Sequence, residues 1–133
     1  MVRSETPRSE ALRSETLTSN TLTIDLVETE NEVRLNWRGK SNDRQPDRFL
    51  VPVLRDALQR SEQGRRPVIM DFTAMEYMNS STFSPLVKML DQAARGTYRL
   101  RLEFSDSRKW QALTFAALKI FETQDGRVSV HAR

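Results

Sequence analysis

Residues 67–82 read PVIMDFTAMEYMNSST, an apolar run followed by a cluster of small polar side chains. The apolar run, broken only by Asp71, is typical of a strand buried on both faces of a sheet. The polar cluster precedes apolar residues at helical spacing, so it stands where a strand passes into a helix. Hydroxyl and amide side chains at such a junction cap the helix, and the N–H groups of its first turn favour a phosphate. We therefore predict a docking or modification site here.

The chain before this stretch predicts a hairpin and one helix. Apolar and polar residues alternate over 22–27 and 33–37 on either side of a polar turn, the pattern of a β-hairpin with one solvated face. Trp37 is expected to anchor the core. Apolar residues recur at helical spacing over 47–63. Because Pro52 falls within that stripe, the helix either begins near Val51 or bends at the proline.

The helix after the junction has two candidate starting points. Serine followed by proline at the first helical position is a strong start signal, which favours Ser84 and Pro85. A start at Asn79 or Ser80 would instead place that proline one turn inside the helix. The sequence leaves both starts open, and Gly96 ends the helix in either case.

The last part of the chain predicts two strands separated by a helix. Residues 98–104 alternate as a strand, and residues 128–130 form a short closing strand. The helix between them begins at Ser105 or Asp106 and is expected to pack one apolar face on the core. That face consists of Trp110, Leu113, Ala117 and Leu118, continued by Ile120 and Phe121. The predicted order is β-β-α-β-α-β-α-β, a mixed β-sheet packed against helices in one α/β domain spanning residues 20–133.

The beginning of the chain carries a short repeat. Arg-Ser-Glu recurs every five positions, at 3–5, 8–10 and 13–15. Since the segment has almost nothing apolar to bury, it cannot offset the entropy cost of ordering. Residues 1–19 are therefore expected to be a disordered tail. The alternative is an arm that becomes ordered on contact with a partner.

Residue types needed for most catalytic and metal sites are missing. The chain has no cysteine and a single histidine, His131, which has no companion ligand or nucleophile at a known spacing. The four glycines are scattered at turns, so they form no phosphate-binding loop. Asp71 is expected to accept backbone N–H bonds rather than to act in catalysis. We therefore expect no enzymatic activity, no metal and no cofactor.

Charge and hydropathy indicate which partners and which cellular compartment to expect for the protein. The formal net charge is +3, and basic residues are interspersed with acidic ones, so direct nucleic-acid binding is not expected. No apolar run approaches the ~20 residues that a membrane span needs, and the first residues lack the apolar core of a secretory signal. A cytoplasmic protein is expected.

The strand, the junction and the last helix together resemble a STAS domain, the module of bacterial anti-sigma factor antagonists. In that family an apolar strand ending in Asp is followed by Met-Asp-Ser-Ser/Thr-Gly at a helix start. The matching residues here are 68–71 and then Met78, Asn79, Ser80, Ser81 and Thr82. The family's Leu-x-x-x-Gly-Leu-x-x-x-Phe corresponds to Leu113, Ala117, Leu118 and Phe121. Two positions of the first motif differ, since Asn79 stands in place of Asp and Thr82 in place of Gly.

The resemblance, which covers about residues 21–130, implies a STAS-like fold and a partner-switching regulator. Ser80 matches the serine that a partner kinase phosphorylates, with Ser81 and Thr82 less favoured. The implied partner-binding surface consists of Met78, Asn79, Ser80, Ser81, Thr82 and Phe83. The unmodified protein would bind a serine kinase or anti-sigma-like regulator, and a metal-dependent Ser/Thr phosphatase would remove the phosphate. The alternative is an unphosphorylated scaffold or interaction subunit of a signalling or transport assembly.

Overall fold

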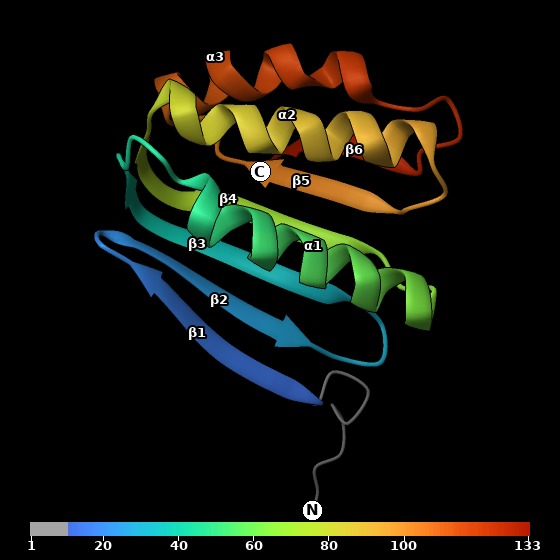
Figure 1. Ribbon diagram of the computed structural model, residues 1–133. Helices are drawn as coiled ribbons and strands as arrows, with labels where there is room; N and C mark the ends of the chain where they lie inside the picture. Colours follow the sequence, from blue (N-terminus) through green and yellow to red (C-terminus); the bar gives the residue numbers. More distant parts are fainter. Residues whose placement is uncertain (1–10) are drawn as a thin grey trace, which may run out of the picture.

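The computed structural model describes residues 11–133, which form a six-stranded mixed sheet and three α-helices (Figure 1). The strands lie across the sheet in chain order; β1–β2 and β2–β3 are antiparallel, and β3 to β6 are parallel. This confirms an α/β fold with a mixed sheet, with one strand more than expected. The elements are β1 (Arg13–Ser19), β2 (Leu22–Glu28), β3 (Val33–Ser41), α1 (Asp47–Gly64), β4 (Val68–Met78), α2 (Ser80–Arg95), β5 (Leu100–Phe104), α3 (Lys109–Ala117), the 3-10 helix η2 (Leu118–Phe121) and β6 (Val128–Ala132).

The additional strand is β1, which occupies residues that the sequence analysis assigned to a disordered tail. It forms an edge of the sheet and pairs antiparallel with β2, with the Thr16 hydroxyl donating to Asp25 at 3.0 Å. An edge strand is held by backbone hydrogen bonds on one side, so it needs few apolar residues, and here only Leu17 packs on the core. The first two Arg-Ser-Glu repeats lie outside the described residues, whereas the third begins β1 at Arg13.

All three helices pack on one face of the sheet (Figure 1). Each parallel pair from β3 to β6 is joined by one helix, and every step moves in the same direction across the sheet. Because such crossovers are right-handed, successive helices fall on the same side. Between helices and sheet lies an aromatic chain in which the ring centroids of Trp37 and Phe72, and those of Phe72 and Phe115, are 4.8 Å apart. Trp37 is 1% exposed, which confirms its role in the core.

The opposite face of the sheet is polar, and no helix within residues 11–133 covers it. Arg34 lies 3.3 Å from a Glu103 oxygen, Arg101 donates to Glu103 at 3.0 Å, and Arg133 donates to Asp71 at 2.7 Å. Asp71 also accepts the backbone N–H of Thr73 at 2.9 Å, as expected from the sequence. The arginines of this face are therefore neutralised by neighbouring carboxylates.

Helix α3 and η2 turn only part of the predicted face to the core: Leu118 is buried and Trp110 and Phe121 pack on the core, whereas the other predicted residues face solvent. Leu113 and Ile120 are 77% and 81% exposed, and Phe115 is buried instead. This helix has apolar residues on more than one side, so spacing alone does not determine which side packs inward. Burial of the Phe115 ring is favourable, and the Gln111 amide fixes the orientation by donating to the carbonyl oxygens of Phe72 at 2.8 Å and Met75 at 3.0 Å.

A buried carboxylate joins the end of α1 to the hairpin. Glu28 is 8% exposed and accepts from Arg60 at 3.0 Å and from Arg66 at 2.7 Å. Burial alone would raise the pKa of Glu28, but the hydrogen bonds and charges of Arg66 and Arg60 outweigh it and hold the pKa below its ordinary value. The stabilising contribution of the carboxylate is therefore complete above the ordinary glutamate pKa and is lost as the pH falls through the lowered value.

We expect Glu28→Gln to lower the free energy of unfolding by about 2 kcal/mol at pH 7, because two guanidinium groups lose their carboxylate. The difference from the parent should shrink as the pH falls through the lowered pKa of Glu28, where the parent carboxylate is itself protonated. Urea denaturation at a series of pH values measures this. Glu76→Gln, at an exposed glutamate of β4, serves as the control with little effect. A loss that stays the same across the whole pH series would contradict the ion-pair explanation.

Candidate functional site

The candidate site lies at the junction of β4 and α2, at the carboxyl edge of the parallel strands. Such edges collect loops from several strands and are common positions for binding sites in α/β proteins. The structure resolves the two possible helix starts: Asn79 is the N-cap, α2 begins at Ser80, and Pro85 lies inside the helix. The N–H of Asn79 donates to the Ser41 carbonyl at 2.9 Å, which ties the junction to the end of β3.

Asn79 holds the first turn of α2 in place. Its side-chain oxygen accepts the N–H of Thr82 at 3.0 Å and the Thr82 hydroxyl at 2.7 Å. Its amide nitrogen donates to the Asp43 carbonyl at 2.8 Å. Asparagine can make all of these contacts because it carries both a donor and an acceptor. The side chain therefore caps the helix and anchors the loop that follows β3.

Thr82 belongs to the interior, although the sequence analysis placed it among the candidates for modification and partner contact. The residue is 0% exposed, and its hydroxyl shares a hydrogen bond with the buried hydroxyl of Ser41. A side chain at the third position of a helix points back toward the cap, which explains why it is enclosed. Thr82 is thus out of reach of a modifying enzyme in the folded protein.

Ser80 and Ser81 face different sides of α2, since successive helical residues are about 100° apart. Ser80 is exposed and lines a hollow of 260 Å³ between the junction and α3, together with Phe83, Thr114 and Ala117. Ser81 is partly exposed and lines a hollow of 440 Å³ on the side of α1. Arg44 and Arg48 line this second hollow with Ser84. Among the described residues, none of the side chains lining the Ser80 hollow is charged.

An apolar stripe on α3 and the following η2 borders the Ser80 hollow. Ala117 lines the hollow, and the strongly exposed Leu113 and Ile120 lie four residues before and three residues after it, on the same side of the helical segment. We call Leu113, Ala117 and Ile120 the α3 stripe. Periodicity had assigned these residues to the core, so the sequence did not indicate this part of the surface. A helix that is apolar on two sides was the available signal.

Two further observations concern metal binding and membrane spanning. Within residues 11–133, the structure brings no three His, Asp or Glu side chains together in a group that would hold a metal ion. None of the helices in that range combines the length and hydropathy needed to cross a bilayer.

No protein-family model matches the chain, and no curated protein matches its sequence. The resemblance to STAS domains therefore remains a hypothesis that depends on the motif residues.

We expect Asn79→Ala to lower the free energy of unfolding by about 1–2 kcal/mol, because the first turn of α2 loses its cap and its link to Asp43. Asn79→Asp should lose less, since a carboxylate still accepts the Thr82 N–H. Chemical denaturation measures both changes. Ser80→Ala is the matched control, with a change within about 0.5 kcal/mol because Ser80 is exposed. A larger loss from Ser80→Ala than from Asn79→Ala would refute the assigned roles.

Proposed function

We propose that this protein is a partner-switching regulator of the STAS type, in which phosphorylation of Ser80 controls docking on a serine kinase or anti-sigma-like regulator. The observation that carries this proposal is the position of Ser80. Its exposed hydroxyl stands at the first residue of α2 and borders the same hollow as the α3 stripe. A modifiable group is thus placed beside a surface suited to a protein partner.

The surface around Ser80 has the composition of a docking site. Met78 and Phe83 are partly exposed, and Leu113 and Ile120 of the α3 stripe are largely exposed. Clustered apolar side chains on the surface favour association, because a partner removes them from water. Binding of the unmodified protein would thus be driven mainly by apolar burial beside the α2 N-terminus.

A phosphate on Ser80 would oppose this contact. It adds a charge of about −1.5 to −2 at neutral pH. The N-terminus of α2 tolerates that charge in the free protein, with a stabilisation of ~0.3–1 kcal/mol. The uncharged lining of the Ser80 hollow supplies no cation to neutralise it when a partner closes over the site. A metal-dependent Ser/Thr phosphatase would restore docking, and both enzymes would meet the protein in the cytoplasm.

Phosphorylation of Ser81 would have a different consequence. Arg44 and Arg48 line the Ser81 hollow, and guanidinium groups bind phosphate through charge-assisted hydrogen bonds. A phosphate there would join α2 to the start of α1 and leave the α3 stripe uncovered. Ser81 is therefore less suited than Ser80 to switch docking off.

The second candidate function is an unphosphorylated scaffold or interaction subunit of a signalling or transport assembly. The exposed α3 stripe favours it, since an apolar surface binds a partner without any modification. In this case binding would depend on Leu113 and Ile120 and would not depend on the charge at Ser80.

We expect Ser80→Asp to weaken binding to the partner at least about tenfold and Ser80→Ala to retain binding when kinase and ATP are present. Ser81→Asp is the matched control and should weaken binding less than about threefold. The partner is isolated by pull-down from the native cell, binding is measured by calorimetry, and intact mass with site mapping reports phosphorylation.

The two candidate functions give different results in this experiment. Phosphate on Ser80 with loss of binding supports the switch. Equal binding by Ser80→Asp and the parent, together with loss of binding by Leu113→Glu, supports the scaffold. Phosphate found only on Ser81 would refute the assignment of Ser80.

A further inference from the structure

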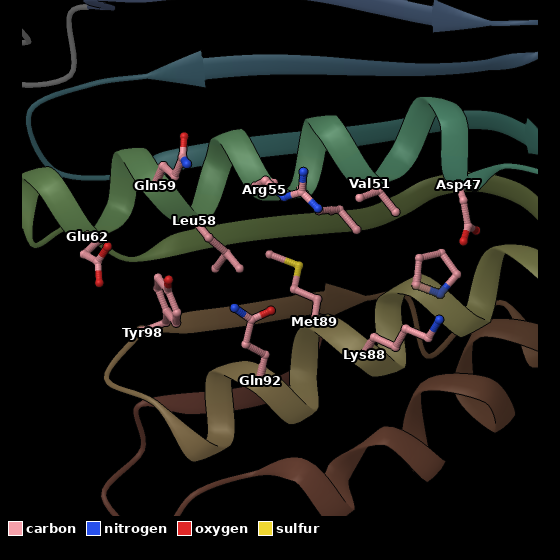
Figure 2. A pocket seen from close by; sticks show the side chains of 12 residues that line it. Asp47, Val51, Arg55, Leu58, Gln59, Glu62, Lys88, Met89, Gln92 and Tyr98 are labelled. Carbon is pink, nitrogen blue, oxygen red and sulfur yellow. The ribbon is translucent and has the colours of Figure 1, made fainter.

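A groove runs between α1 and α2, on the side of α2 away from the Ser80 hollow (Figure 2). Its central part has a volume of 460 Å³. Figure 2 shows α1 along one wall and α2 along the other, with Leu58 and Met89 projecting toward each other between the helices. Val51, Leu54 and Pro85 also line it. The floor of the groove is therefore apolar.

The groove continues beyond both ends of its central part. Asp47 is shared with the Ser81 hollow of 440 Å³ at one end. Glu62 and Tyr98 are shared with a further hollow of 440 Å³ at the other end. Asp47 and Glu62 are fifteen residues apart on α1, so the groove extends about 22 Å along the helix. This is the length of a helix of four turns rather than that of a small molecule.

The central part of the groove carries as many acidic as basic residues, and basic residues outnumber acidic ones at both of its ends. Seven basic residues and two acidic residues, Asp47 and Glu62, line the three connected hollows. The excess of basic over acidic residues in these hollows is larger than the formal net charge of the whole chain, which is +3. Positive charge is thus concentrated along one line of the surface, where it attracts an anionic partner.

Six of these seven basic residues have no ion pair or side-chain hydrogen bond within residues 11–133. They are Arg44, Arg48, Arg55, Arg65, Lys88 and Arg99. In contrast, most basic residues outside the groove are paired, including Arg34, Arg127 and Arg133. Among the described residues, the fold therefore neutralises most of its cations elsewhere and leaves all but Arg66 of those in the groove available.

We propose that the α1–α2 groove binds an acidic amphipathic helix of a partner protein. An apolar face of such a helix would cover Leu58 and Met89, and its acidic side chains would pair with Arg55 and Lys88 on the two walls. Acidic residues at its ends would meet the arginines of the two outer hollows. This surface is separate from Ser80, and the inference does not rest on phosphorylation.

A nucleic acid would pair with the basic residues of the groove, but it would not match the apolar floor. Bases bind on such surfaces by stacking, and Tyr98 is the only aromatic side chain among the described residues that line the groove and its two ends. The aliphatic floor instead suits leucine or isoleucine at helical spacing. Preferential binding of single-stranded DNA would therefore contradict the proposed helical partner.

The test uses the full chain and a fluorescein-labelled helical peptide of about 18 residues, with leucine along one face and glutamate elsewhere. Fluorescence anisotropy measures its affinity. We expect binding that weakens as salt is raised, and a loss of at least about tenfold for the double variant Arg55→Glu/Lys88→Glu. A peptide with lysine in place of glutamate should bind the double variant more tightly than it binds the parent. Because Arg55 and Lys88 are both exposed and make no ion pair within residues 11–133, the variant should keep the parent's thermal unfolding midpoint.

Lys119→Glu is the matched control, because Lys119 is an exposed lysine on η2 outside the groove. Its affinity for the acidic peptide should stay within about twofold of that of the parent. The proposal is overturned if the acidic peptide does not bind, or if the double variant binds it as the parent does. Equal affinity for a scrambled peptide of the same composition, or tighter binding of single-stranded DNA than of the peptide, also overturns it.

Discussion

The packing of all three helices on one face of the sheet is the constraint on which the other features depend. The strands from β3 to β6 follow one another in a single direction, and right-handed connections then leave the helices no other side. One face of the sheet becomes the core, with Trp37 and Phe72 at its centre. The other face must satisfy its own charges, which it does through Arg34, Glu103 and Arg133. The same arrangement sets α2 between α1 and α3 (Figure 1). A hollow lies on each side of α2.

The start of α2 combines a fixed backbone with a free hydroxyl. Asn79 and Thr82 bind one another and the loop after β3, so the first turn is held on its inner side. Ser80 takes no part in these contacts and is exposed. A covalent charge at Ser80 can therefore change what the surface binds without breaking the cap. The same charge at Thr82 would have to be buried, at a large desolvation cost.

Strong local patterns predicted most elements of the fold. Alternation located β2 and β3, and the apolar run at 67–72 located the first part of β4. The run predicted burial on both faces, but helices cover only one face of β4, and the strand continues to Met78. β1 was missed because an edge strand is stabilised by its neighbour's backbone rather than by its own side chains. The helix start at Ser80 rather than Ser84 was also undetermined. It depends on the contact of Asn79 with Asp43, which is 36 residues away along the chain.

Part of the inward face of α3 was predicted wrongly for a related reason, although Trp110, Leu118 and Phe121 do pack on the core. Leu113, Ala117 and Ile120 share a side at helical spacing, and nothing in that spacing shows that Phe115 and Gln111 fit the core better. Tertiary packing decides between two apolar sides of one helix, and it leaves the other side in water.

The two sides of α2 differ in chemistry, and this difference allows two partners to be distinguished. On the α3 side, the hollow beside Ser80 is uncharged and bordered by apolar side chains, so the affinity of the proposed partner would depend on burial and would be sensitive to an added charge. On the α1 side, cations such as Arg55 and Lys88 flank an apolar floor, so the affinity of the proposed helix would depend on its negative charge and on salt. One helix thus separates a contact that a phosphate would weaken from a contact that requires an anionic partner. Because Ser80 and Ser81 open to opposite sides of α2, the choice of serine decides which of the two contacts a phosphate affects.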